Sequence, residues 1–481
     1  MSHADSRSLS WAFVATAALC STTAVSQPFY RAEPQFFLDA GSAHTVSSVS
    51  RAGDVNGDGI GDVLVGDYDV NDPYDNDDDG PGTPTVRSGT TGEVLYTFTP
   101  DASAGRFGIS VHGAGDVNND GVADFIISDP QDTLHGRNTG SVRVYSGATG
   151  DVLYTFHGDA RDDRLSSGQI VGDLNGDGFA DFILNGGRDA QGRRLVRVMS
   201  GATAEVLYSY ADLWASTTGV GDVNNDGFDD FAFGESSDGT NGQNAGRVSV
   251  VSGATGDVLH EFFGDYAGDN LASGLQAGDV NNDGFNDILT RSPWRDTPAG
   301  GRGFVRVHSG VSGDVLHTFW GEDEGAHFGI VAVGIGDVNG DGSDDVAIGD
   351  NSYGFTGAVW VYSGADGSLL VRLDGLDDSR FGASVSGIGD INNDGLADFV
   401  VSADQPPYDY ANGIRGGFAT VFLSRMCERA DVDCDGKCTP ADFNAWVIAF
   451  NNQAPACDQN GDGLCDPSDF NAWVLNFNAG C

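Results

Sequence analysis

One aspartate-rich pattern, D-x-N-x-D-G-x-x-D, occurs seven times in this 481-residue chain. Side-chain oxygens at positions 1, 3 and 5 lie on one side of a tight loop, glycine at position 6 permits the sharp turn, and position 7 offers a backbone carbonyl. All-oxygen ligands in a flexible loop suit Ca²⁺ rather than Zn²⁺ or copper. The sequence therefore predicts seven calcium loops, which we number 1 to 7 and which start at Asp54, Asp116, Asp173, Asp222, Asp279, Asp337 and Asp390.

The predicted ligands occupy positions 1, 3, 5, 7 and 9 of each loop. In loops 1 to 4 they are Asp54, Asn56, Asp58, Ile60, Asp62, Asp116, Asn118, Asp120, Val122, Asp124, Asp173, Asn175, Asp177, Phe179, Asp181, Asp222, Asn224, Asp226, Phe228 and Asp230. In loops 5 to 7 they are Asp279, Asn281, Asp283, Phe285, Asp287, Asp337, Asn339, Asp341, Ser343, Asp345, Asp390, Asn392, Asp394, Leu396 and Asp398. Without a metal these segments would be Asx-rich turns, but their carboxylates would then repel one another. We expect calcium ions with a structural role.

An additional acidic run, residues 75–80, repeats the opening of a calcium loop and places Thr83 at position 9. It is either an extra calcium site or a solvated acidic loop. The whole chain is strongly acidic, with 71 acidic against 24 basic residues and a formal net charge of -47. Such a surface repels nucleic acid and anionic membranes, so neither is an expected partner.

A longer repeat of about 56 residues surrounds each loop, with four short alternating strands and turn residues between them. A Ser-Gly turn joins the last two strands in six units, at Ser88, Ser146, Ser200, Ser252, Ser309 and Ser363. Radial repetition of four-stranded units gives a β-propeller, and a solenoid is the alternative. The seventh unit lacks a fourth strand, and residues 36–39 supply one from the N-terminus. This closure favours a mainly β, seven-bladed propeller.

Because the strands alternate in direction, the calcium loops and the Ser-Gly turns should share the lower face of this propeller. The loops on the opposite face vary in length and are where ligands usually bind. They are residues 67–84, 129–140, 185–194, 234–246, 290–303, 350–357 and 402–417, with shorter links between the blades. Aromatic residues there could stack on sugars or contact a protein, or simply pack within the loops: Trp294, Trp320, Tyr353, Tyr408 and Tyr410. The motifs H-E-x-x-H and G-x-S-x-G are absent. Paired carboxylates for glycoside hydrolysis stay an open alternative.

Two loops near the C-terminus follow another pattern, with twelve residues, glycine at position 6 and a carboxylate at position 12. Their predicted calcium ligands are Asp431, Asp433, Asp435, Lys437, Asp442, Asp458, Asn460, Asp462, Leu464 and Asp469. Each loop leads into Phe-Asn-Ala-Trp-Val, and the apolar residues that follow have helical spacing. These features predict two EF-hand-like units whose tryptophans, Trp446 and Trp473, lie in a small core.

Six of the seven cysteines lie in the last 55 residues, and the seventh is Cys20. An even number in a small exported module indicates disulfides, whereas the spacing fits no zinc finger and no histidine lies among them. Residues 1–26 have the pattern of a secretory signal peptide, with cleavage after Ser26. A lipid anchor on Cys20 is the alternative, against which the bulky Leu19 argues.

Residues 35–424 resemble the FG-GAP repeats of the integrin α-chain propeller and its bacterial relatives. The matching features are the Phe-Gly pairs at Phe107, Phe328 and Phe381, the Gly-Asp-Val-Asn-Asn-Asp-Gly loops and the apolar strand after each loop. Leu165 and Leu271 stand where two blades would have the phenylalanine. The resemblance implies a seven-bladed propeller with calcium on its lower face. The family fills only some blades with calcium, whereas all seven loops match here.

Residues 427–481 resemble a dockerin, on aspartate at loop position 12, the 27-residue duplication and the terminal Gly480-Cys481. The resemblance implies binding to a cohesin module on another protein. Residues at loop positions 10 and 11 and on the following helices would contact it: Pro440, Ala441, Val447, Pro467, Ser468 and Val474. Proline departs from the usual polar pair there. Cys438 and Cys465 both occupy loop position 8, where paired EF-type loops face each other, so we expect them to form a disulfide.

The expected organisation is a signal peptide at 1–26, a calcium-binding propeller at 27–424 and a dockerin-like domain at 425–481. We expect an exported or cell-surface, non-enzymatic protein for adhesion or protein interaction. The propeller would present an unknown protein or glycan ligand face, and the tail would tether it to a cohesin-type partner. The alternative is a carbohydrate-binding or polysaccharide-degrading component of a cellulosome-like complex. Ca²⁺ is the expected cofactor, at about nine sites.

Overall fold

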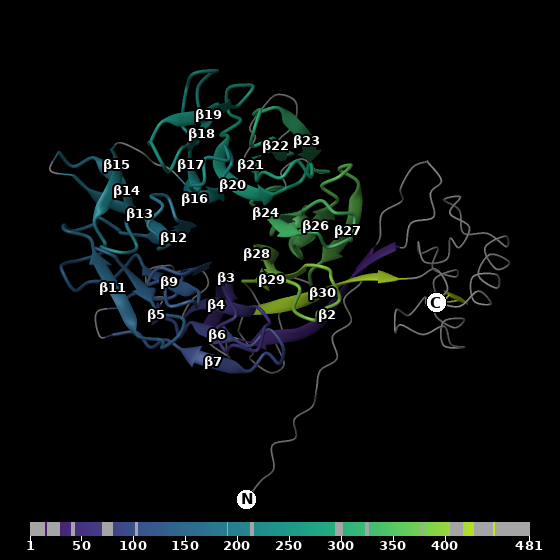
Figure 1. The fold of residues 1–481 in the computed structure, drawn as a ribbon, viewed down its shortest axis with the longest axis horizontal. Helices are drawn as coiled ribbons and strands as arrows, with labels where there is room; N and C mark the ends of the chain where they lie inside the picture. The colour runs from purple at the N-terminus through teal and green to yellow at the C-terminus, as the bar shows by residue number, and fades with distance from the viewer. Residues whose placement is uncertain are drawn as a thin grey trace, which may run out of the picture.

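Seven antiparallel sheets lie around a central axis in the computed structural model, each with the first strand of its repeat nearest the centre (Figure 1). The structure describes residues 15–16, 29–39, 44–69, 80–101, 104–189, 191–211, 216–293, 302–322, 327–376, 379–404, 417–427 and 446–447. The closed ring confirms the prediction of a seven-bladed propeller and excludes the solenoid. We call the sheets blades 1 to 7, so that blade number and loop number agree.

The strands of blades 1 to 4 follow one another in chain order within each sheet. They are β3 (His44–Gly53), β4 (Asp62–Asp69), β5 (Gly80–Pro81), β6 (Thr85–Arg87), β7 (Val94–Thr97), β8 (Ser110–Gly115), β9 (Asp124–Asp129), β10 (Ser141–Tyr145), β11 (Val152–His157), β12 (Ser167–Gly172), β13 (Asp181–Arg188), β14 (Arg194–Met199), β15 (Val206–Ala211), β16 (Ser216–Gly221), β17 (Asp230–Glu235), β18 (Arg247–Val251) and β19 (Val258–Phe263).

Blades 5 and 6 repeat this order, and blade 6 also carries a short outer strand and one 3₁₀ turn. Their elements are β20 (Ala272–Gly278), β21 (Asp287–Ser292), β22 (Phe304–His308), β23 (Val315–Trp320), β24 (Val331–Gly336), β25 (Asp345–Asp350), η1 (Tyr353–Phe355), β26 (Ala358–Tyr362), β27 (Leu369–Asp374) and β1 (Ala15–Thr16), which pairs with β27.

Blade 7 is built from both ends of the ring. Its strands β28 (Phe381–Gly389), β29 (Asp398–Ala403) and β30 (Phe418–Cys427) come from the C-terminal side, and β2 (Phe29–Asp39) adds the outer strand antiparallel to β30. The register pairs Asp39 with Phe418 and Phe29 with Cys427. The predicted closure by an N-terminal strand is therefore confirmed. β30 continues three residues beyond Ser424, where the sequence places the end of the propeller.

Apolar cores lie between neighbouring blades. The aromatic rings of the Phe-Gly positions, Phe107, Phe328 and Phe381, are almost completely buried. Leu165 and Leu271 are equally buried, and each forms a parallel bridge with a glycine of the preceding blade, as Phe381 does. Leucine thus replaces phenylalanine in this role without a change of backbone geometry. Burying such a side chain stabilises the fold by roughly 1.5–3 kcal/mol.

A repeated hydrogen bond also joins each of the first five blades to the next. The third residue of the fourth strand reaches the Ser-Gly turn of the following blade and bonds to a backbone carbonyl there. The pairs are Tyr96 with Ala148, Tyr154 with Gly201, Tyr208 with Gly253, His260 with Gly310 and His317 with Gly364. The Oη–O distance is 2.8 Å for both Tyr154 and Tyr208. The sequence carries a signal for this contact, since only tyrosine or histidine occupies the position in these five blades.

Tyr154→Phe and Tyr208→Phe are each expected to lower the free energy of unfolding by about 1 kcal/mol, because each removes one hydrogen bond and leaves a carbonyl without its partner. The two sites belong to different blade junctions, so their effects should add. Denaturant titration of the single and double variants measures this. A loss below a few tenths of a kcal/mol for both single variants would contradict the role of these contacts.

His308 on β22 is buried, its Nε2 lies 3.0 Å from Thr290 Oγ1, and its ring stacks on Phe262. Burial lowers the pKa of His308 to about 4. The unfolded chain, with an ordinary histidine pKa of about 6.5, takes up a proton first as the pH falls. Stability should therefore fall between pH 6.5 and 4, by about 2 kcal/mol at pH 5 from this residue. Denaturant midpoints at neutral pH and pH 5 should differ less in His308→Gln; an equal difference would refute the assignment.

Of the C-terminal module expected at 425–481, the structure describes only residues 425–427, which end β30, and Trp446 and Val447. Trp446 is buried, at 6% exposure. The loops and helices predicted for 425–481, with the Cys438–Cys465 disulfide, therefore stay predictions beyond β30. Within the described residues, no helix is both long and apolar enough to cross a membrane.

Candidate metal centre

The seven aspartate loops lie at the same end of every blade. Each loop leaves the innermost strand and delivers its position 9 aspartate as the first residue of the second strand, as Asp124 does at the start of β9. The Ser-Gly turns lie beside the loops, because the turn glycine donates a hydrogen bond to that aspartate in six blades, for example Gly147 N to Asp124 Oδ1 at 2.9 Å. Calcium loops and Ser-Gly turns share one face, as the strand alternation predicts.

The position 1 carboxylate organises each loop from within. In all seven loops its Oδ2 accepts the N–H of the glycine at position 6, at 2.7–2.9 Å. In loop 1, Asp54 Oδ1 also accepts N–H groups from Gly57 and Asp58. The chain is thereby wrapped around the first predicted ligand of each loop.

Positions 3 and 5 add two smaller turns inside the loop. In loop 1, Asn56 Oδ1 accepts the N–H of Asp58, and Asp58 Oδ1 accepts the N–H of Ile60. The position 5 to position 7 hydrogen bond recurs in all seven loops at 2.9–3.1 Å. These bonds hold the side chains of positions 3 and 5 against the backbone of the loop.

Position 4 has a left-handed backbone in every loop, which the sequence interpretation missed. It is glycine in loops 1, 3 and 6 and asparagine in the other four, with φ between 55° and 75°. Glycine and asparagine tolerate this conformation better than other residues. The alternation between these two residue types at position 4 was the signal in the sequence.

Position 9 links the loop to the rest of its blade. Asp124 is fully buried; its Oδ2 accepts the N–H of Val117 at position 2 at 2.8 Å, and its Oδ1 accepts the turn N–H of Gly147. The same pair of bonds recurs in all seven loops, and in blade 7 Ser424 N replaces the turn glycine. The turn residue must be glycine, since a Cβ on Gly147 would lie 1.8 Å from the carbonyl oxygen of Ala123.

Burial raises the pKa of every position 9 aspartate, and the backbone N–H groups only partly oppose this. The pKa of Asp345 is raised to about 8, and those of Asp181 and Asp398 to about 7. The pKa values of Asp124, Asp230 and Asp287 are raised to about 6, and that of Asp62 is also raised. Among the described residues, none of the seven forms an ion pair with an arginine or histidine. A buried carboxylate without a cationic partner is costly.

The donor set of each loop fits a hard divalent cation. It consists of carboxylate, amide and backbone oxygens, the ligands that Ca²⁺ takes six to eight at a time. An ionised carboxylate has about four lone-pair sites, so an oxygen that accepts one N–H can still bind a cation. In the described part of the chain, however, no group of three His, Cys, Asp or Glu side chains is gathered closely enough to hold a metal. Calcium would have to draw the loop carboxylates together.

Two other predicted calcium regions lie outside the described residues: both C-terminal loops, and most of the acidic run at 75–80. Thr83 is described, and its backbone N–H donates to Asp67 Oδ1 at 2.9 Å. Trp294, Tyr408 and Tyr410 of the opposite face also lie outside the described residues. Of the aromatic residues expected there, Trp320 is about half exposed, and Tyr353 packs edge-on against Trp360.

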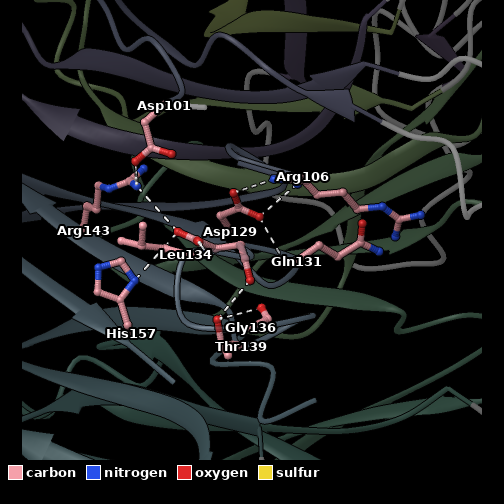
Figure 2. Close-up of polar contacts among 11 residues, drawn as sticks. Asp101, Arg106, Asp129, Gln131, Leu134, Gly136, Thr139, Arg143 and His157 are labelled. Atoms are coloured by element: carbon pink, nitrogen blue, oxygen red, sulfur yellow. Dashed lines mark hydrogen bonds and ion pairs between the residues drawn. The ribbon is translucent and has the colours of Figure 1, made fainter. Parts of the chain in front are cut away.

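The opposite, upper face contains a buried polar cluster between blades 1 and 2 that sequence reasoning did not find (Figure 2). Asp129, at the end of β9, is fully buried and accepts N–H groups from Gly105, Arg106 and Gln131. Burial raises the pKa of Asp129. This carboxylate ties the connection between the blades to the β9–β10 hairpin.

A second buried carboxylate continues the cluster. Asp132 Oδ1 accepts the N–H of Leu134, and its Oδ2 lies 3.6 Å from Arg143 Nη2 and 3.8 Å from His157 Nδ1. Arg143 also pairs with Asp101, and Figure 2 shows these two side chains pointing toward each other. The upper loop of blade 2 is therefore held by polar contacts of these two carboxylates.

Arginines gather on the upper face of blade 3. Arg188 and Arg194 lie directly opposite each other across the β13–β14 ladder. Burial, with smaller contributions from the nearby charges of Arg188 and Arg164, lowers the pKa of Arg194. Acidic residues lie beside them, since Arg188 Nε is 3.9 Å from Asp163 Oδ1 and Arg193 Nη2 is 2.6 Å from Asp189 Oδ2.

Comparison with known proteins agrees with this geometry. The FG-GAP repeat model matches residues 214–251 and 272–308, which hold the first three strands of blades 4 and 5. Integrin alpha-6 of Gallus gallus is 35% identical over 150 residues, which are 28% of this chain and 13% of that protein. Integrin alpha-4 of Xenopus laevis is 32% identical over 159 residues, 30% of this chain and 15% of that protein. The alignments thus span only about a seventh of these relatives.

The solved structure of Saccharomyces cerevisiae Sqt1 superposes with a TM-score of 0.47 at 10% identity, covering 83% of this chain and all of that one. The fold is a seven-bladed β-propeller, and two of its blades match the FG-GAP repeat model. Less than a third of the chain is similar to integrin alpha chains.

Proposed function

We propose that this chain is an exported, calcium-stabilised scaffold that binds a ligand through the upper face of its propeller. The observation that carries the calcium part is the set of seven fully buried position 9 aspartates with no basic partner among the described residues. A divalent cation bound by positions 1, 3, 5, 7 and 9 would neutralise this charge and join the loop to the second strand of its blade. The loops would then serve architecture, and the opposite face recognition.

The ligand face has two described features that suit binding. Trp320 is 47% exposed beside Phe304, and the arginines at 164, 188 and 194 lie close together on blade 3. Exposed tryptophan and arginine are the residue types most often found at the energetic centre of protein interfaces. The similarity to integrin alpha chains supports an adhesion or protein-binding scaffold over an enzyme.

The tail is the second part of the proposal. A dockerin-like module at 425–481 would tether the propeller to a cohesin-type partner, because its two twelve-residue loops duplicate after 27 residues. The competing function is a carbohydrate-binding or polysaccharide-degrading component of a surface complex, which the exposed tryptophan also fits.

A binding panel separates these functions. The full chain, with calcium present, is applied to arrays of glycans and of extracellular proteins, and in parallel is incubated with polysaccharides to detect released products. The proposal expects binding that Trp320→Ala or Arg188→Ala weakens at least severalfold, with no product release. Val258→Ala, on the lower part of the blade rim, is the matched exposed control. Product release from any polysaccharide would instead support the enzyme.

A further inference from the structure

Neighbouring calcium loops touch at position 8. In four junctions the backbone N–H of this residue donates to the carbonyl of position 1 in the preceding loop. The pairs are Ala180 with Asp116, Asp229 with Asp173, Asp344 with Asp279 and Ala397 with Asp337, at 2.8–3.1 Å. The contacted residue is the one that supplies the first predicted calcium ligand. The loops are therefore connected to each other as well as to their own blades.

At two junctions position 8 is aspartate, and the contact is doubled. Asp229 Oδ2 accepts the N–H of Asp173 at 2.9 Å, and Asp344 Oδ2 accepts the N–H of Asp279 at 2.9 Å. Each position 8 aspartate thus binds both backbone groups of a position 1 residue. The aspartate side chain at these two junctions accepts a second hydrogen bond, which the methyl groups of Ala180 and Ala397 cannot do.

The residue before each contacted loop makes room for this contact. A Cβ on Gly172 would lie 1.9 Å from Asp229 Oδ2, and one on Gly278 would lie 2.1 Å from Asp344 Oδ2. Both glycines also have positive φ, 89° and 80°. Glycine precedes position 1 in all seven loops, and at these two junctions its missing Cβ leaves room for the carboxylate.

Position 8 lies between two predicted ligands of its own loop. Asp229 stands between Phe228, whose carbonyl is the position 7 ligand, and Asp230 at position 9. Calcium in loop 4 would fix residues 228–230, and with them the carboxylate that holds Asp173 in loop 3. The same argument connects loop 6 to loop 5 through Asp344.

We propose that Asp229 and Asp344 are positioning residues that couple adjacent calcium loops, so that loops 3 and 4, and loops 5 and 6, fill as cooperative pairs. The inference depends on the calcium binding proposed above. Coupling of this kind is reciprocal, so calcium in loop 3 favours calcium in loop 4 to the same degree. Loops 2 and 3, joined at Ala180 by the backbone bond alone, should be coupled more weakly.

In loop 5 the position 8 side chain is held by a neighbour and does not reach the preceding loop. This residue is Asn286, whose Oδ1 accepts a hydrogen bond from Gln276 Nε2 at 3.1 Å. The amide nitrogen is then the atom nearest Gly221, where a Cβ would lie 2.0 Å from Nδ2. An amide turned in this way offers no acceptor to the preceding loop. The junction between loops 4 and 5 therefore separates the two proposed pairs.

The test measures amide hydrogen exchange of the full chain as a function of free calcium and reads the midpoint of protection for the peptide covering loop 3. Loop 4 is inactivated by Asp226→Ala, which removes its position 5 ligand. The loop 3 midpoint should then rise roughly three- to tenfold, the effect of one or two lost hydrogen bonds. In an Asp229→Ala background, where only the backbone bond to Asp173 is left, Asp226→Ala should change it less than twofold. Asp229→Asn, which keeps an oxygen acceptor, should restore part of the coupling.

The matched control inactivates loop 3 by Asp177→Ala and reads loop 2, across the Ala180 junction. Its midpoint should move less than twofold, given the single backbone contact. The coupling is wrong if Asp226→Ala leaves the loop 3 midpoint unchanged, or if it shifts this midpoint equally in the Asp229→Ala background. Neither result would contradict calcium binding itself. Absence of calcium-dependent protection in every loop of the unaltered chain would instead overturn the proposed function.

Discussion

Calcium removal is expected to lower the unfolding temperature of this protein by roughly 10 °C. At free calcium tenfold above the dissociation constant, each occupied loop adds about 1.4 kcal/mol to the free energy of unfolding. Seven loops together give about 10 kcal/mol, and the unfolding entropy of a propeller of this size converts that into the stated shift. The physical reason is that calcium binds the folded loops, whose buried aspartates have no basic partner in the part of the chain that the structure describes, and not the unfolded chain.

Calorimetry in calcium and in chelator measures this shift. The essential control is magnesium with matched ionic strength, because screening alone stabilises a chain with net charge -47. Ca²⁺ and Mg²⁺ differ in preferred coordination, and these loops suit the larger ion. If magnesium or sodium chloride restored the full unfolding temperature, the stabilisation would come from charge screening and not from calcium sites.

The second large effect is expected for a position 9 aspartate. Asp124→Ala removes the acceptor for the N–H groups of Val117, Asn118 and Gly147 and leaves two of them buried. Each buried, unsatisfied group costs about 1–3 kcal/mol, so a loss of about 3–5 kcal/mol is expected even in chelator. The loop would separate from the Ser-Gly turn of its blade, in addition to losing its calcium ligand.

Asp120→Ala is the matched control in the same loop. Its position 5 side chain is exposed and bonds only within the loop and to the Ser146 hydroxyl. It should therefore reduce the calcium response without much loss of stability in chelator. Denaturant titrations of both variants, with and without calcium, separate the two roles. Equal losses of unfolding free energy for Asp120→Ala and Asp124→Ala in chelator would show that the buried position 9 aspartate contributes no more to stability than the exposed position 5 aspartate.

The architecture was accessible from the sequence because each blade repeats the same local pattern. Period-2 strands, the loop motif and the Ser-Gly turn fixed the four-strand unit, and the incomplete seventh unit with residues 36–39 indicated the closure that β2 and β30 provide. The structure was needed to show that Leu165 and Leu271 take over the packing role of phenylalanine. Repetition carries this information without any alignment.

The parts of the site that the sequence did not predict depend on contacts between segments that are far apart in the chain. The hydrogen bond from Gly147 to Asp124 spans 23 residues, and that from Asp173 to Asp229 spans 56. Neither has a signature within its own segment, except that the turn glycine is present in all six blades that have the Ser-Gly turn. The polar cluster around Asp132 is similarly non-local. The tyrosines and histidines of the fourth strands recur at one position in the sequence, but only the structure shows that they form hydrogen bonds to the next blade.

The most direct test of the account is the number of calcium ions bound per chain at millimolar free calcium, measured by equilibrium dialysis or native mass spectrometry. Seven propeller loops and two C-terminal loops predict about nine ions, and Asp124→Ala should remove one of them. A chain that binds no calcium under these conditions, or whose bound calcium is unchanged when a position 9 aspartate is replaced, would contradict the assignment of these loops as calcium sites.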